Sequence, residues 1–299
     1  MKIVWIGQRL YFGPHVPTEI AGHETVFIEY AQGVQDPSIL RGLGADVVFC
    51  FRGEHIPHDV LDSMSGIKVM ISTEPIPQIV GKKTIITTDR AQRMSDLVRA
   101  GAFDFRFHFD KTSLPYLKEH GQNFDGEFVL PINIDQLGGF SARGGGANWD
   151  VLLAARDTVY RRMMTTPLKH SLGGRFCHVA HGFSGESLRY VAGRSLIGLN
   201  IHVDGNPSLE PRVPLLMVMG LMVVSEPLSP NDLYKSGVHY IEVPAGDAGN
   251  LRERVMAFIS SPDDVKRIAQ AGYELVVNKL DSSREWLELA KRVSGKSKG

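Results

Sequence analysis

The sequence predicts an α/β protein built from two domains, each with a mostly parallel β-sheet. Short apolar, β-rich runs alternate with helix-compatible stretches along the chain, and this alternation is typical of βαβ units. The 299 residues are enough for two domains that each have a core. Residues 141–148 contain three consecutive glycines, which disfavour a regular element and indicate a linker between the domains.

The first domain is expected over residues 1–140. Its opening strand is the apolar run at residues 2–7, which Gly7 closes. Further strands are expected at residues 25–29, 46–51, 68–72, 84–87 and 103–109, and helices at residues 37–43, 57–63, 90–100 and 113–120.

The second domain is expected over residues 148–280. Its strands are predicted at residues 150–154, 176–180, 195–200, 221–225 and 240–243, and its helices at residues 159–171, 214–220, 250–260 and 262–279. The last of these helices has a strong start signal, because serine at 261 suits the N-cap and proline at 262 the first helical position. The remaining segment, residues 281–299, carries an amphipathic helix near residues 283–293 with Trp286, Leu287 and Ala290 on one face.

Composition narrows the class of protein. Charged residues make up 22% and apolar residues 43% of the chain, which is typical of a soluble globular protein. Basic and acidic residues both number 33, so no global field favours nucleic acid. The start of the chain reads as a strand, and the longest apolar run, residues 213–224, is too short to be a transmembrane segment. We therefore expect a cytoplasmic protein in which Cys50 and Cys177 are buried free thiols.

An anion-binding site is predicted in residues 199–225. There a short apolar segment ends in Asn200 and His202, and a loop rich in Gly and Pro then leads to Arg212 at the start of an apolar helix. Free backbone N–H groups and the helix dipole favour a phosphate in such a place, and a guanidinium can pair with it in bidentate fashion. A surface arginine that caps a loop, a turn asparagine and a solvated histidine would show the same residues.

Other nucleotide-using classes are disfavoured. Neither a P-loop nor a Gly-x-Gly-x-x-Gly turn follows the first strand, which argues against an ATPase or an ordinary dehydrogenase. The eleven histidines show no zinc spacing, and no Asp-x-Asp motif sits where a metal–diphosphate bridge would need it. We expect neither a metal nor a cofactor.

The order of residues in this region resembles the glycosyltransferases of GT-B fold, and within them the "group 1" branch of CgeB-like, spore-maturation proteins. That family shows Leu-Asn-x-His, a loop with small residues, Arg-x-x-Glu, a glycine five positions on and a hydrophobic strand. The matching positions here are Leu199, Asn200, His202, Ser208, Arg212 and Gly220. The acidic position of the family is Leu215, and a leucine cannot accept a hydrogen bond from a donor hydroxyl.

The resemblance implies two Rossmann-like domains facing a cleft, with the C-terminal helix crossing back to pack on the first domain through Trp286. It implies a nucleotide-sugar donor on the second domain, next to Asn200, His202, Ser208 and Arg212. A basic residue at the helix after the strand at residues 150–154 would contact the diphosphate; Arg161 and Arg162 both fit, and Arg156 is a third option. His181 and Gly182 would lie near the base. A surface arginine pair is the alternative for residues 161 and 162.

The first domain would bind the acceptor, in part through the loop at residues 8–17. A catalytic base would have to come from this domain, and the candidates are His15, Glu54, His55 and Glu74. Glu74 is favoured, together with His15, because it directly follows a strand where relatives often place an acid. A solvated loop carboxylate is the alternative.

The resemblance thus implies metal-independent transfer of a sugar from a nucleotide-sugar to an unidentified hydroxyl acceptor. Glu210 is the nearest acid that could replace the missing one at Leu215. The main alternative is a non-catalytic binding or partner protein that kept the fold and lost the donor-site acid. Another enzyme of the same architecture, such as a nucleotide-sugar epimerase, is a third interpretation.

Overall fold

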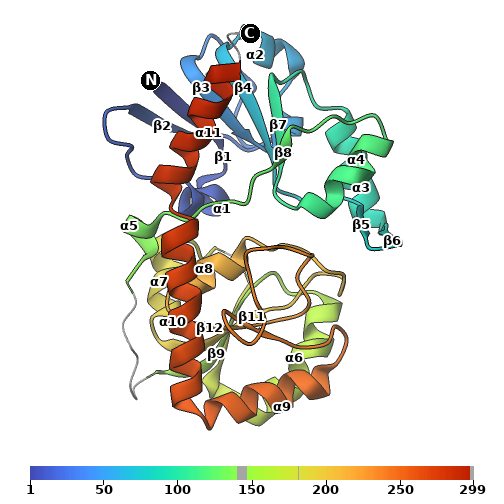
Figure 1. Ribbon diagram of the computed structural model, residues 1–299, viewed down its shortest axis with the longest axis vertical. Coiled ribbons are helices and arrows are strands. Elements are labelled where there is room, and N and C mark those ends of the chain that lie inside the picture. The colour runs from blue at the N-terminus through green and yellow to red at the C-terminus, as the bar shows by residue number, and fades with distance from the viewer. Residues whose placement is uncertain (140–146, 181, 297–299) are drawn as a thin grey trace. The chain divides into compact units, whose positions relative to one another are not determined.

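The computed structural model describes residues 1–139, 147–180 and 182–296, and the chain divides into two compact units (Figure 1). Unit 1 consists of Met1–Pro131 together with Ser282–Gly299, and unit 2 consists of Ile132–Asp281. Residues 132–139, which we expected in the first domain, are grouped with unit 2. The linker expected at residues 141–148 lies, apart from Ala147 and Asn148, outside the described residues.

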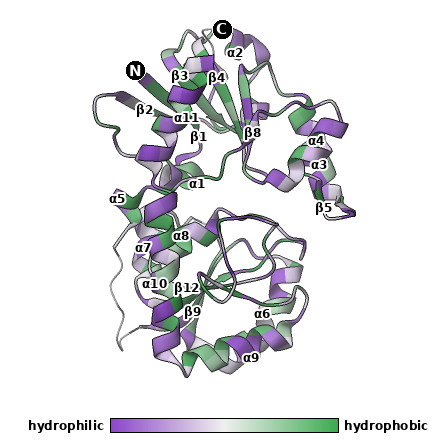
Figure 2. Cartoon of the chain, viewed as in Figure 1, coloured by the Kyte–Doolittle hydropathy of each residue, from purple (hydrophilic) through white to green (hydrophobic). Residues whose placement is uncertain are grey.

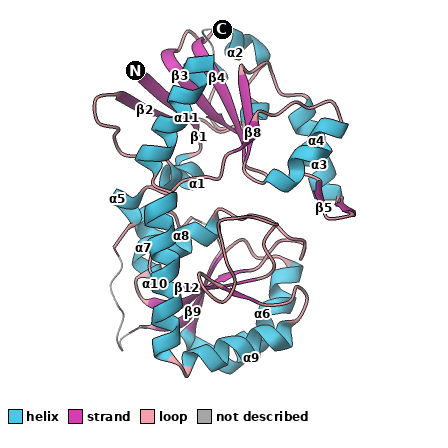
Figure 3. Cartoon of the chain, viewed as in Figure 1, coloured by secondary structure: helices cyan, strands magenta, loops and turns pink. Residues whose placement is uncertain are grey.

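The main sheet of unit 1 is parallel and has the order β2-β1-β3-β4-β7-β8 (Figure 3). Its strands are β1 (Lys2–Gly7), β2 (Glu24–Glu29), β3 (Gly44–Phe51), β4 (Ser65–Ser72), β7 (Phe105–His108) and β8 (Gly126–Glu127). The helices are α1 (Arg9–Phe12), α2 (His58–Ser63), α3 (Thr88–Val98) and α4 (Leu114–Glu119). Strands β1 and β3 are buried on both faces, which explains their continuous apolar sequences.

Two expected elements of unit 1 differ in the structure. The run at residues 84–87 is not a strand of the main sheet: β6 (Lys83–Ile85) pairs antiparallel with β5 (Gln78–Val80) in a separate hairpin. Gly81, with φ of 63°, allows the tight turn between them. The helix expected at residues 37–43 is a single 3₁₀ turn, Pro37–Leu40, because the chain turns at Gly42 with φ of 68°.

Unit 2 has a parallel sheet with the order β10-β9-β11-β12-β13. Its strands are β9 (Trp149–Ala154), β10 (Phe176–Val179), β11 (Ser195–Asn200), β12 (Met222–Ser225) and β13 (Ile241–Glu242). Its helices are α5 (Ile134–Leu137), α6 (Val159–Leu172), α7 (Gly185–Ala192), α8 (Arg212–Val218), α9 (Ala248–Ile259) and α10 (Pro262–Lys279). Helix α7 was not predicted, and the Ser261 side chain makes no capping hydrogen bond although α10 begins where expected.

In both units the first strand lies between the second and the third. The chain therefore passes from the first strand to a neighbour on one side, and then crosses to a third strand on the other side. In such sheets a crevice opens at the carboxyl ends of the first and third strands, where the direction of the connections reverses. In unit 1 this topological switch point falls between β1 and β3, and in unit 2 between β9 and β11. The carboxyl ends of the strands at such switch points are where α/β folds bind ligands.

The final helix, α11 (Ser282–Lys296), packs on the sheet of unit 1, as expected (Figure 1). Trp286 is fully buried, and its ring centroid lies 4.7 Å from those of Phe49 and Phe128 and 5.9 Å from that of Trp5. Its Nε1 donates to the carbonyl of His15 at 2.7 Å. Trp286 therefore joins the apolar core of unit 1. Figure 2 shows that much of the sheet of this unit is hydrophobic.

Two further expectations concern the environment of the chain. Among the described residues, no helix combines the length and the apolar character needed to cross a bilayer. Cys50 and Cys177 are free thiols, but only Cys50 is buried, and Cys177 is partly exposed at the edge strand β10.

Candidate functional site

Arg161 joins the ends of the two strands at the switch point of unit 2. It lies in the first turn of α6, whose N-cap Thr158 accepts a hydrogen bond from the backbone N–H of Arg161. The guanidinium is buried, with Nε donating to the carbonyl of Ile201 at 2.8 Å and Nη1 to that of Arg156 at 3.0 Å. Because Arg156 follows β9 and Ile201 follows β11, this side chain fixes a positive charge at the crevice.

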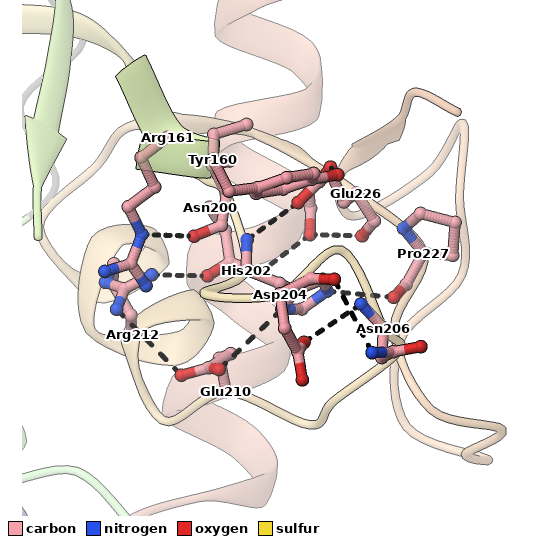
Figure 4. Close-up of polar contacts among 12 residues, drawn as sticks. Tyr160, Arg161, Asn200, His202, Asp204, Asn206, Glu210, Arg212, Glu226 and Pro227 are labelled. Atoms are coloured by element: carbon pink, nitrogen blue, oxygen red, sulfur yellow. Dashed lines mark hydrogen bonds and ion pairs between the residues drawn. The ribbon is translucent and has the colours of Figure 1, made fainter. Parts of the chain in front are cut away.

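A second guanidinium, that of Arg212, lies beside the first (Figure 4). Arg212 begins α8, and its Nη1 donates to the Oδ1 of Asn200 at 2.8 Å. The amide of Asn200 is held in turn by the Oγ of Ser225, to which its Nδ2 donates at 2.9 Å. Burial and the neighbouring charge of Arg212 lower the pKa of Arg161 to about 10. The structure thus places two guanidinium groups side by side, with the carboxylates of Glu210 and Glu226 near enough to offset part of their charge.

Glu210 is the acid of this cluster. Its carboxylate lies between the Nδ1 of His202, 3.7 Å away, and the Nη2 of Arg212, 3.9 Å away. Burial alone would raise the pKa of Glu210, but the imidazole of His202 and the charges of Arg212 and Arg161 outweigh it and lower the pKa to about 2. The carboxylate is therefore ionised at neutral pH, and its side chain keeps 18% of its surface exposed.

Glu226 fixes the loop that carries these residues. This fully buried carboxylate follows β12; its Oε2 accepts from the backbone N–H of His202 at 2.7 Å, and its Oε1 accepts from the hydroxyl of Tyr160. The Tyr160 oxygen accepts from the backbone N–H of Gly246 at 2.9 Å, and the His202 ring bonds the carbonyl of Pro227 at 2.9 Å. Sequence reasoning missed both Tyr160 and Glu226; an acid directly after a buried strand was the available signal.

The structure thus brings together Arg161, Asn200, His202, Glu210 and Arg212. Ser208 lies in the same loop, with a buried Oγ that has no hydrogen-bond partner among the described residues. Leu215 lies one helical turn after Arg212 and is partly exposed.

Three donor-side positions remain. Arg162 points away from the cluster: its side chain is 55% exposed and pairs with Asp157 at 2.5 Å. This is the surface arginine that the sequence left as an alternative. Gly182 is exposed, and His181 lies outside the described residues.

In unit 1, Glu74 lies within a network of charged side chains rather than free in solvent. Its Oε1 accepts from the Nη1 of Arg52 at 2.8 Å, and its Oε2 pairs with the Nη1 of Arg93 at 2.6 Å. The Nε of Arg52 also donates to Glu54 at 2.7 Å. Both oxygens of Glu74 are therefore occupied by guanidinium groups.

His15 is a core residue. It is 2% exposed, and its Nδ1 lies 2.9 Å from the carbonyl of Pro131, to which the neutral ring donates. Burial lowers the pKa of His15 to about 4, although the bond to Pro131 opposes this shift. A ring enclosed in this way does not suit a base that must meet an acceptor hydroxyl, and we no longer assign His15 that role.

The buried His15 predicts a pH dependence of stability. The unfolded chain takes up a proton as the pH falls through 6.5, whereas the native ring stays neutral down to about 4. The free energy of unfolding is therefore expected to fall between pH 6.5 and 4, by up to about 1.4 kcal/mol per pH unit from this group. Urea unfolding of wild type and His15→Gln across this range measures it. Equal slopes for the two proteins would contradict the prediction.

Several solved structures share this fold. The HepE protein of Anabaena in complex with UDP-glucose matches with a TM-score of 0.65 at 10% identity, over 99% of this chain and 100% of that chain. Sucrose-phosphate synthase of Thermosynechococcus elongatus matches with a TM-score of 0.64 at 10% identity, over 99% and 100%. A glycosyltransferase of Rickettsia africae matches with a TM-score of 0.53 at 11% identity, over 98% of both chains. No protein-family model and no curated protein sequence matches the chain.

The chain therefore has the fold of the GT-B glycosyltransferases, with two Rossmann-like domains and a C-terminal helix that returns to the first. At identities of 10–11%, the likeness defines the architecture and leaves the chemistry to the site residues.

Proposed function

We propose that the protein transfers a sugar from a nucleotide-sugar bound by unit 2 to a hydroxyl acceptor. The supporting observation is the pair of guanidinium groups, Arg161 and Arg212, at the switch point between β9 and β11. A nucleoside diphosphate needs such a positive site, and UDP-glucose is bound by HepE, which has the same fold. The order of Asn200, His202 and Arg212 favours the CgeB-like branch within this proposal.

The chemistry assigned to the pair is electrostatic. When the bond between the sugar and the diphosphate breaks, negative charge develops on the leaving diphosphate, and donors already in place stabilise it. Arg212 is proposed to contact the diphosphate directly, because its side chain is 18% exposed. Arg161 is buried and contributes its positive charge without direct contact. Asn200 positions Arg212, and the buried hydroxyl of Ser208 has no hydrogen-bond partner among the described residues. The proposal needs neither a metal nor a cofactor, and the two free thiols fit the cytoplasm.

Glu210 is proposed to take the place of the family acid at Leu215. It is ionised, partly exposed and held beside Arg212, so it can accept hydrogen bonds from donor hydroxyls. Glu210→Gln keeps the shape but loses the charge, and it is expected to weaken donor binding about tenfold or more, with a matching loss of turnover. Titration calorimetry and nucleotide-sugar hydrolysis measure the two effects, with the exposed Glu253→Gln as control.

The rival function is a binding protein without catalysis, and the specific observation in its favour is Leu215. If Glu210→Gln binds donors like wild type, and wild type neither transfers nor hydrolyses any nucleotide-sugar offered, the rival holds. A thermal-shift screen over UDP, GDP, ADP, CMP and dTDP comes first, because a bound ligand raises the melting temperature by mass action.

Glu74, the acceptor-side base that the sequence favoured, is proposed to have a different role. Each oxygen of Glu74 contacts a guanidinium group, that of Arg52 or that of Arg93, and these positive charges favour the ionised carboxylate and weaken it as a base. We therefore propose that Glu74 holds Arg52 in place, which is a positioning role rather than that of a base.

A further inference from the structure

Unit 1 contains a cavity of about 180 Å³ at the carboxyl ends of β1, β2 and β3. Its lining includes Gln8, Phe12, Gln32, Phe51, Arg52 and His55. The cavity thus lies at the switch point of unit 1, between β1 and β3, the place in an open α/β sheet where ligands bind.

Arg52, in the lining, has a strained backbone. Its φ of 56° and ψ of 44° are left-handed, and it is the one residue other than glycine with positive φ in the part of the chain that the structure describes. Such conformations persist only where surrounding contacts enforce them, and they cluster at functional sites. The Arg52 side chain is held by its contacts to Glu54 and Glu74, and by a third from Nη2 to the Nε2 of His55 at 2.6 Å.

The charges around the cavity disfavour an anionic ligand. Arg52 and Arg93 face three carboxylates, those of Glu54, Glu74 and Asp89. Burial, followed by the charge of Arg52, lowers the pKa of His55, so the imidazole is neutral. Three carboxylates against two guanidinium groups give this cluster a net negative charge, which repels a phosphate but not a neutral ligand. Of the five N–H donors of its guanidinium, Arg52 uses three on Glu54, Glu74 and His55, which leaves two for the hydroxyl groups of a neutral ligand.

The shape and the apolar wall set the size of the ligand. The rings of Phe12 and Phe51 stack with centroids 4.3 Å apart and planes 1° from parallel, and Gln8 and Gln32 add amide donors and acceptors. A cavity of about 150 Å³ holds one benzene ring, so 180 Å³ suits a single six-membered ring. A hydroxylated ring offers apolar C–H faces to aromatic side chains and O–H groups to the polar ones.

We propose that this cavity binds one neutral, hydroxylated six-membered ring, a sugar or a cyclitol, held by Arg52. That this ring belongs to the acceptor rests on the proposed glycosyl transfer, whereas binding of the ring itself does not.

The test is ligand-observed NMR with methyl glucoside and myo-inositol as neutral probes and glucose 6-phosphate as the anionic one. The wild type should bind at least one neutral probe in preference to the phosphate. Arg52→Gly suits the left-handed backbone, and combining it with Glu54→Gln avoids an unpaired carboxylate; this double variant should bind about tenfold or more weakly. Gln8→Ala leaves the Arg52 contacts intact and should bind severalfold more weakly. Arg99→Ala, an exposed arginine outside the cavity, should bind like wild type.

UDP titration of the same proteins separates the two proposals. Neutral-ring binding that is weakened in both cavity variants supports the inference, whether or not the wild type binds UDP. Absence of UDP binding would count against the proposed function alone. Preference for glucose 6-phosphate, no neutral-ring binding by the wild type, or unchanged ring binding in both cavity variants would overturn the inference.

Discussion

Replacing Trp286 by alanine is expected to lower the free energy of unfolding of unit 1 by about 3–5 kcal/mol, the usual cost of removing a large aromatic ring from a core. The side chain is fully buried among Trp5, Phe49, Phe51 and Phe128, and its loss also leaves the carbonyl of His15 without its donor. Urea unfolding followed by far-UV circular dichroism measures the change.

The matched control is Trp149→Ala in unit 2, where the ring is only partly buried. Its cost should be smaller and confined to the unfolding of unit 2. A loss below about 1 kcal/mol for Trp286→Ala would contradict the packing described for α11, since that is the scale of an ordinary surface or peripheral change.

The second large effect is expected at Arg212. Arg212→Ala should reduce the affinity for a nucleoside diphosphate about ten- to a hundredfold, because a charge-assisted contact to phosphate contributes about 1.5–3 kcal/mol. Arg212→Lys keeps the charge but loses the planar, two-pronged donor geometry of the guanidinium. Its affinity for the diphosphate should therefore lie between those of the wild type and Arg212→Ala. Titration calorimetry with UDP and UDP-glucose, or with the diphosphate that stabilises the wild type most, measures the loss.

Arg162→Ala is the control for Arg212, since its guanidinium is exposed and pairs with Asp157. It should bind like wild type. A dissociation constant for Arg212→Ala within about twofold of the wild-type value would contradict the proposed anion site in unit 2. The proposal of glycosyl transfer would then lose its main support.

Much of the fold was predictable from the sequence for a physical reason. Strands buried on both faces appear as continuous apolar runs, and β1 and β11 have the bounds expected of them. The errors fall where local sequence is ambiguous. Residues 84–87 are β-rich, but Thr84 and Ile85 belong to a hairpin strand outside the main sheet, and only the pairing with β5 reveals this. Helix α7 was missed because its apolar face is short and interrupted by polar residues.

The site was predictable where the contacts are close in sequence and unpredictable where they are not. Asn200, His202 and Arg212 lie at the ends of one loop or within it, so their association could be read from the order of residues. Glu226 and Tyr160 are 66 positions apart in the chain, and only the folded sheet brings them together. The left-handed conformation of Arg52 is likewise invisible in the sequence, because arginine has no preference for it and Glu74, one of the residues that hold its side chain, lies 22 positions away.

The division of unit 1 into two chain segments has a consequence for biosynthesis. Unit 2 is a single uninterrupted stretch, whereas unit 1 needs Ser282 and the residues that follow it to cover the aromatic side chains of its sheet. During synthesis the N-terminal segment emerges from the ribosome first. Trp5, Phe49 and Phe128 are then exposed, because Trp286, which packs against them in the folded protein, has not yet been made. Exposed apolar surface of this kind is prone to aggregation. The nascent chain therefore carries this uncovered face throughout the synthesis of unit 2, and the N-terminal unit is completed last.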